Sequence, residues 1–177
     1  LKGDTAVKKY TQLFDGISIE SLLVSKNEIE TAEKETSEEL KNAINLAKAN
    51  IEKFHSAQKT ERITVETTEG VVCWQEKRAI QKVGLYIPGG TAPLFSTVLM
   101  LAIPANIAGC KEIILCTPPD KNGKINPAIL YTATLCGVTK IFKIGGIQAI
   151  GTMTFGTESI PSVYKIFGPG NQFVTVA

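Results

Sequence analysis

The spacing of hydrophobic residues divides the chain into a helical first part and a second part in which strands alternate with helices. Near the N-terminus, Val7, Tyr10 and Phe14 recur at helical spacing, and Asp4 stands where an N-cap is expected. A second helical stretch follows, about 20 residues long. Its apolar positions recur four and three residues apart: Leu40, Ile44, Ala47, Ile51 and Phe54. This pattern predicts a long helix with one buried and one solvated face.

Two places in the first third have the spacing of a capping box. In this motif a Ser or Thr side chain and a Glu three residues later satisfy the first backbone N–H groups of a helix. Ser25 with Glu28 is one such pair, and Thr36 with Glu39 is the other. Each pair predicts the start of a helix.

A change from helical to alternating spacing predicts a β-hairpin after the long helix. The run RITVET alternates apolar and polar residues, Glu69-Gly70 offers a turn, and VVCWQEK resumes an extended pattern.

From about Ile80 onward, short apolar runs alternate with helical segments. The predicted strands are KVGLYI, KEIILCT, TKIFKIG and SVYKIFG. The first intervening helix is expected to be capped by Ser96 and to end at Gly109, and Asn126-Pro127 should begin the next one. Apolar strands joined by helices of this length predict an α/β fold, a parallel sheet with helices on both faces.

Glycine-rich turns follow three of the four predicted strands, and they carry the candidate chemistry. They read PGGT, GG and GPGN, whereas Pro118-Pro119 follows the second strand. Ligands of open α/β sheets bind beyond the carboxyl ends of the strands, so three such turns predict a binding crevice. Tyr86, Gln148 and Asn171 lie at these turns. A phenol and two amides suit a neutral polar ligand such as a nicotinamide or a ribose, and they do not suit proton abstraction.

The chain lacks residues that a P-loop, a Rossmann fingerprint or a zinc site would require. GLYIPGGT resembles a P-loop but has Gly90 in place of the lysine, so a triphosphate site is not expected. GPGNQF breaks the Rossmann fingerprint at Phe173. The chain has one histidine, His55, which we interpret as structural, and no Cys-x-x-Cys pair, so no zinc site is expected from these residues.

The composition agrees with an ordinary globular protein and narrows its partners. Apolar residues make up 44%, charged residues 20%, and the net charge is +2. Lysines are interleaved with glutamates, which argues against a nucleic-acid partner, and no apolar run is long enough for a membrane span. The four cysteines lie in apolar surroundings and are interpreted as reduced core residues, which predicts a cytoplasmic protein. A start without Met and a last helix that breaks off predict a fragment.

Three long motifs occur in order along the chain: VGLYIPGGTAPLFSTVLMLAIPANIAGCKEIILCTPP, GGIQAIG and FGTESIPSVYKIFGPGNQFVT. They closely resemble the histidinol dehydrogenase family from about Val83 to Thr175. A looser resemblance in GDTAVKKYTQLFDG and IEKFHSAQK upstream extends it over nearly the whole chain. The resemblance implies an incomplete Rossmann-like parallel sheet of the aldehyde dehydrogenase-like superfamily, preceded by an N-terminal helical arm and β-hairpin. Residues 1–80 would be the arm and hairpin of the first domain, and residues 81–177 a truncated NAD-binding domain.

The same resemblance implies a function. The family oxidises L-histidinol to L-histidine via L-histidinaldehyde, with NAD as the hydride acceptor, in the last step of histidine biosynthesis. Its members use a zinc ion and a Glu-His pair and form intertwined homodimers. The family's NAD-contacting residues fall on Tyr86, Gln148 and Asn171, whereas its zinc ligands and catalytic pair lie beyond residue 177. We therefore expect no metal site in this stretch and no activity from it alone.

Two other interpretations remain open from the sequence. One is a standalone nucleotide-binding module without catalysis. The other is a different dehydrogenase of the aldehyde dehydrogenase-like fold, which would need a nucleophilic cysteine at a strand-to-helix turn. Cys116, at the end of KEIILC, is the nearest candidate for that nucleophile.

Overall fold

The computed structural model describes residues 2–90, 92–170 and 172–177. The helices of this part of the chain are α1 (Gly3–Asp15), α2 (Lys26–Glu35), α3 (Glu38–Ser56), α4 (Phe95–Ala108), α5 (Pro127–Leu135), α6 (Gly146–Phe155) and α7 (Gln172–Val176). The strands are β1 (Ile63–Thr68), β2 (Val71–Gln75), β3 (Lys82–Tyr86), β4 (Glu112–Thr117), β5 (Lys140–Lys143) and β6 (Lys165–Phe167). None of these helices is both long and apolar enough to cross a membrane.

Four strands form a parallel sheet in the order β5-β4-β3-β6, which confirms the α/β prediction. The chain places its first sheet strand, β3, in the interior and reaches both neighbours through helical crossovers, as a Rossmann-like sheet does. β4 is buried over Ile113–Thr117, and β6 lies at an edge. The carboxyl ends of all four strands therefore meet at one edge of the sheet.

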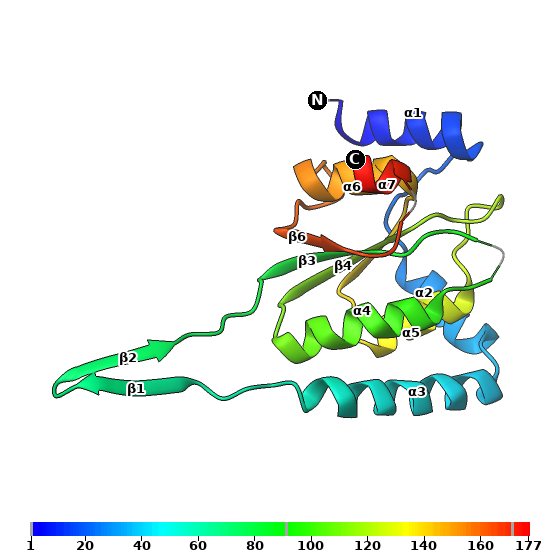
Figure 1. Cartoon of the computed structure of the whole chain (residues 1–177). Helices are drawn as coiled ribbons and strands as arrows, with labels where there is room; N and C mark the ends of the chain where they lie inside the picture. The colour runs from blue at the N-terminus through cyan, green and yellow to red at the C-terminus, as the bar shows by residue number, and fades with distance from the viewer. Residues whose placement is uncertain (1, 91, 171) are drawn as a thin grey trace.

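Helices cover both faces of this sheet (Figure 1). One face carries α4 and α5, with α3 packed on α4 and α2 on α5, and the other carries α6 with α1 packed on it. Alternation along β3 sends Val83 and Leu85 into the first core and Tyr86 into the second. Because α2 and α3 contribute residues to the first core, these N-terminal helices also stabilise the strands of the sheet.

Most of the helix boundaries expected from the sequence are confirmed. The capping box at α2 is complete, since Ser25 accepts from the Glu28 backbone N–H and the Glu28 side chain accepts from that of Ser25. Asn126 caps α5, with Pro127 in its first turn. Gly109 ends α4 in the left-handed conformation.

Two predicted caps in the first third are wrong by one or two residues. The N-cap of α1 is Lys2, and Asp4 lies inside the first turn, where its carboxylate accepts hydrogen bonds from Ser159. Thr36 ends α2 and donates its hydroxyl to the Ala32 carbonyl, so α3 is capped by Ser37 instead. Asp4 thus has a distant partner, and Thr36 has one in the preceding turn of α2.

The predicted cap of α4 is also wrong. Ser96 lies in the first turn of α4, whose N-cap is Leu94 without a side-chain hydrogen bond. The turn before it contains prolines, so the chain enters the helix without the usual polar cap.

Some residues expected on buried faces are exposed. On α1, Val7 and Thr11 point inward, while Tyr10 and Phe14 stack on each other at the surface with ring centroids 5.7 Å apart. On α3, Ile44 is fully buried, but Phe54 near the helix end is 66% exposed. The helical period was correct, and the width of each buried face was overestimated.

The β-hairpin is confirmed, and it lies apart from the sheet. β1 and β2 pair antiparallel, with an irregular register between Glu66 and Thr68. Every residue of both strands is exposed, and the hairpin projects away from the helices and the sheet (Figure 1). Such an isolated two-stranded ribbon is marginally stable by itself.

Candidate functional site

The turns at the carboxyl edge of the sheet pack tightly on one another. A Cβ added at Gly89 would lie 2.7 Å from the Pro118 ring, and one added at Gly145 would lie 2.6 Å from it. Both distances are too short for a side chain, so glycine lets the turns after β3 and β5 close on the proline after β4. Two of the glycines that predicted a ligand crevice are therefore explained by packing of protein on protein.

Gly168 serves the same purpose at the end of β6. A Cβ at this position would lie 2.3 Å from the Tyr86 carbonyl oxygen, which is a backbone atom and cannot move aside. The absence of a side chain lets the turn after β6 lie directly against the last residue of β3. The turn after the edge strand β6 thus helps to fix the position of the Tyr86 backbone.

Tyr86 lies at the centre of this edge and is 5% exposed. Its hydroxyl oxygen accepts a hydrogen bond from the Gly146 backbone N–H at 3.1 Å, at the start of α6. Burial raises the pKa of Tyr86, the nearby Asp15 charge raises it further, and the bond from Gly146 offsets only part of this. Tyr86 therefore keeps its proton, and no other described residue accepts it, so the hydroxyl can donate to a ligand.

Gln148 lies in the first turn of α6, two residues beyond Gly146. Its Nε2 donates to Asp15 Oδ2 at 3.2 Å, at the end of α1. The Gln148 side chain borders a groove between α1 and α6, whereas Tyr86 borders a separate cavity on the β6 side. The structure thus brings Tyr86 and Gln148 to either side of Gly146, and their use as a single site stays a prediction.

Asn171, the third predicted cofactor residue, lies outside the described residues. Asp15 was missed by the sequence reasoning. Nothing in QLFDG marks it, since an acidic residue near a helix end and before a glycine is ordinary. Its contact with Gln148 spans 133 positions along the chain and depends on the docking of α1 against α6.

The cavity beside Tyr86 has a volume of about 230 Å³. It is lined by Tyr86, Ile150, Ile166, Gly168, Gly170, Val174 and Thr175. Pockets that enclose a whole drug-sized ligand measure roughly 300–1,000 Å³, so this one can hold a ring or a comparable group of a larger ligand. A second hollow of about 350 Å³ lies along the same edge, between the turns after β3 and β4.

Comparison with known proteins agrees with this arrangement. The family model described as histidinol dehydrogenase matches residues 1–177. The chain belongs to the histidinol dehydrogenase family. It is 69% identical over 175 residues to histidinol dehydrogenase from Bacteroides fragilis, covering 99% of this chain and 41% of that protein. The corresponding enzyme from Escherichia coli is 55% identical over 176 residues, covering 99% of this chain and 40% of that protein.

A solved structure supports the fold at the same level. The crystal structure of histidinol dehydrogenase from Elizabethkingia anophelis superposes with a TM-score of 0.95 at 60% sequence identity, covering 98% of this chain and 40% of that one. The chain therefore spans about 40% of the length of the histidinol dehydrogenases it resembles.

The nucleophilic cysteine of the alternative dehydrogenase hypothesis does not fit this structure. Cys116 is fully buried, and burial raises the pKa of its thiol far above the usual range. A neutral thiol without access to substrate cannot attack it. Cys116 is a core residue of this histidinol dehydrogenase family member.

A zinc ion, which the sequence resemblance implies, would need a set of ligands. Within the described part of the chain, no three His, Cys, Asp or Glu residues come close enough together to hold a metal ion. His55 instead contacts the Gln58 side chain, with Nδ1 3.0 Å from Oε1. A zinc ion therefore has no ligand set among these residues.

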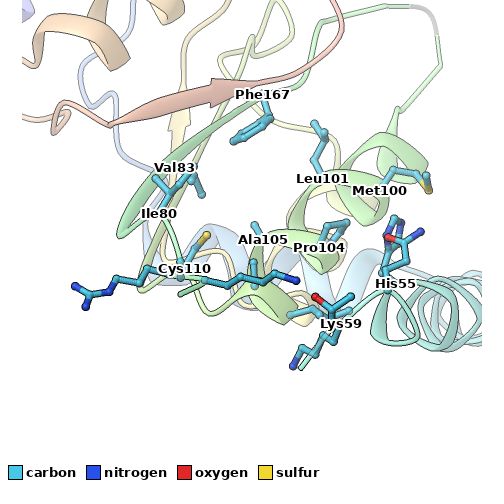
Figure 2. A pocket seen from close by; sticks show the side chains of 17 residues that line it. His55, Lys59, Ile80, Val83, Met100, Leu101, Pro104, Ala105, Cys110 and Phe167 are labelled. Atoms are coloured by element: carbon cyan, nitrogen blue, oxygen red, sulfur yellow. The ribbon is translucent and has the colours of Figure 1, made fainter. Parts of the chain in front are cut away.

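A groove of about 760 Å³ lies away from the carboxyl edge (Figure 2). It lies between the end of α3, the second half of α4 and the strands β3 and β6, which contribute Val83 and Phe167. Its lining is largely aliphatic, with Ile80, Met100, Leu101, Pro104 and Ala105 among it. Polar residues also line it, among them Lys59, Lys77 and Arg78. A mostly apolar surface with such polar residues around it is typical of contacts with protein.

Proposed function

We propose that the protein to which this chain belongs oxidises L-histidinol to L-histidine via L-histidinaldehyde, with NAD as cofactor. This would be the last step of histidine biosynthesis, and the enzyme would work in the cytoplasm. Family membership over all 177 residues supports the reaction class. The observation that carries the proposal is the position of the buried Tyr86 hydroxyl on Gly146, two residues before Gln148 in the first turn of α6.

In this proposal the chain supplies cofactor binding. NAD, when bound, accepts the hydride. Tyr86 donates a hydrogen bond from its hydroxyl, and Gln148 offers a side-chain carbonyl oxygen. The small cavity beside Tyr86 excludes water around one group of the cofactor. We assign Asn171 to the same set because of its place in the GPGN turn and the resemblance. We also keep residues 81–177 as the cofactor domain and residues 1–80 as the arm and hairpin of the first domain.

We further propose that the ligands of the zinc ion and the acid–base pair of the enzyme lie outside this stretch of the protein. The 177-residue chain alone is then expected to leave NAD unreduced in the presence of histidinol. Turnover by this polypeptide would contradict the division. A nucleotide-binding module without catalysis is the alternative, and it predicts no turnover from the full-length protein either.

The cofactor assignment is tested in the full-length protein. We expect Tyr86→Ala or Asn171→Ala to raise the KM for NAD by roughly tenfold, the loss of one or two hydrogen bonds and their packing. The zinc content, measured by atomic absorption, should stay unchanged. Loss of zinc with an unaltered KM for NAD would show that the assignment is wrong.

We also propose that the protein is a homodimer to which the hairpin contributes. The hairpin exposes Val65, Val71, Val72 and Trp74, each about half accessible or more. The apolar groove begins at the hairpin's base, where Lys77 and Arg78 contribute to it. Light scattering should give a dimer for the full-length protein. Replacing Val65 and Trp74 by Ser should shift it toward monomer, and an unchanged dimer would contradict the role of the hairpin.

A further inference from the structure

Asp15 connects the N-terminal helix to the candidate cofactor site. It is the last residue of α1, and its Oδ2 accepts the hydrogen bond from Gln148 Nε2 at 3.2 Å. α1 packs on α6, so the contact joins two neighbouring helices rather than a flexible tail and the body. No other described side chain is hydrogen-bonded to the Gln148 amide.

The chemistry of Asp15 determines which way the Gln148 amide faces. An ionised carboxylate only accepts hydrogen bonds, so it binds the NH2 end of the amide and leaves the carbonyl end free. The structure agrees, because Gln148 Oε1 faces the turn, where it would lie 3.1 Å from a Cβ added at Gly146. Without Asp15 the amide could rotate by half a turn and present NH2 there instead.

Asp15 is also close enough to Tyr86 to influence its ionisation. Its negative charge adds to burial in raising the pKa of the Tyr86 hydroxyl. Partial burial also raises the pKa of Asp15 itself, and the hydrogen bond from Gln148 offsets part of this effect. Tyr86, Gln148 and Asp15 thus form one polar cluster around the Gly146 turn, with one hydroxyl donor and one carbonyl acceptor left for a ligand.

We propose that Asp15 is a positioning residue that fixes the Gln148 amide with its carbonyl oxygen toward the cofactor. The ligand group that fits is an N–H or O–H donor, such as a carboxamide or a ribose hydroxyl. The inference rests on the proposed NAD binding at Tyr86 and Gln148. It adds that the N-terminal helix, more than 130 positions away in the chain, controls the polarity of that site.

Three variants of the full-length protein separate the orientation of the Gln148 amide from the charge of Asp15 and from the stability of α1. Asp15→Ala removes the acceptor for Nε2. Asp15→Asn keeps a carbonyl oxygen that can accept the same bond and removes only the charge. Asp4→Ala is the matched control, because Asp4 ties the other end of α1 to Ser159 and does not touch Gln148.

NAD binding is measured by isothermal titration, and KM for NAD and for histidinol in steady state. Asp15→Ala should raise both the Kd and the KM for NAD roughly three- to tenfold, the worth of one hydrogen bond, with KM for histidinol within about twofold. Asp15→Asn should stay within about twofold of the wild type for NAD. Asp4→Ala should lower the melting temperature and leave the affinity for NAD unchanged.

The same measurements show which idea fails. Equal weakening by Asp15→Asn and Asp15→Ala would overturn the positioning role, since the charge would matter and not the orientation. If Asp4→Ala weakened NAD binding as much as Asp15→Ala does, the effect would come from loosened packing of α1 and not from the orientation of the Gln148 amide. Tyr86→Ala distinguishes the two levels: if it weakens NAD binding while Asp15→Ala does not, only this inference is wrong. If neither variant alters NAD binding, the proposed cofactor site is wrong as well.

Discussion

The ion pair between Glu28 and Lys143 gives a sharp test of how the early helices hold the sheet. Lys143 ends β5, and its Nζ lies 2.9 Å from Glu28 Oε1 on α2, with 11% of the lysine side chain and 31% of the glutamate side chain exposed. The other carboxylate oxygen of Glu28 accepts from the Ser25 backbone N–H and hydroxyl, each at 2.8 Å. One carboxylate therefore completes a capping box and neutralises a nearly buried ammonium.

Removing the carboxylate affects both interactions. Losing the capping box costs about 1 kcal/mol. Leaving the Lys143 ammonium unpaired in a nearly buried position costs about 2 kcal/mol more, the usual worth of a charge-assisted hydrogen bond. Glu28→Ala should therefore lower the free energy of unfolding by about 3 kcal/mol. Lys143→Met should cost less, because Ser25 still donates to the remaining carboxylate and Met fills a similar volume.

The assay is urea unfolding followed by far-UV circular dichroism, because the single tryptophan, Trp74, lies on the exposed hairpin and reports poorly on the sheet. The double variant completes a cycle whose coupling energy should be about 2 kcal/mol. A coupling energy below about 0.5 kcal/mol would refute the reasoning, since the two groups would then act independently. So would a greater cost for Lys143→Met than for Glu28→Ala.

Three further predictions follow from single contacts. Gly168→Ala places a Cβ 2.3 Å from the Tyr86 carbonyl oxygen, so it should lower the free energy of unfolding in urea by at least about 2 kcal/mol. Gly151→Ala, on α6 with open space around it, is the control and should be neutral or stabilising by up to about 1 kcal/mol. Equal effects of the two variants would contradict the steric argument. Tyr86→Phe leaves the Gly146 N–H without its acceptor, so it should lower stability by about 1 kcal/mol and weaken NAD binding in calorimetry; unchanged binding would remove the hydroxyl from the site. For Glu28, burial raises the carboxyl pKa but the bonds from Ser25 and Lys143 outweigh it, so the folded pKa lies below the unfolded one. That stabilisation is present above the unfolded pKa and is lost as pH falls through the folded pKa, so acidification from neutral pH should destabilise the wild type more than Glu28→Gln, and parallel pH profiles would contradict it.

What could be predicted from the sequence is what depends on neighbours along the chain. The hydrophobic periods gave the strands and helices of the sheet, and Ser25 with Glu28 gave a capping box because both partners lie within four residues. Asp4 failed for the complementary reason, because its partner Ser159 lies far away in the chain. Thr36 failed locally: its hydroxyl donates to the Ala32 carbonyl in the preceding turn, so it ends α2 and does not begin α3.

The candidate site divides in the same way. Tyr86 and Gln148 could be proposed from the sequence because Tyr86 ends a strand and Gln148 follows one, and parallel strands end at one edge of the sheet. Asp15 could not, because its contact exists only where α1 docks on α6. The glycines can now be interpreted differently. Gly89 and Gly145 lie in the turns after β3 and β5, and their close contact with Pro118 is enough to explain why they lack side chains.

The distance between α6 and β3 shows how a buried residue outside the turns sets the geometry of the site. Gly84 lies two residues before Tyr86 on the same face of β3. A Cβ there would lie 2.5 Å from the Met153 sulfur, and Met153 is fully buried and cannot swing into solvent. The glycine thus lets α6 approach the strand closely. Since Gly146 begins the same helix, that approach brings its N–H within 3.1 Å of the Tyr86 hydroxyl. The hydrogen bond between Gly146 and Tyr86 therefore depends on the packing of Met153, farther along α6, against Gly84 of β3.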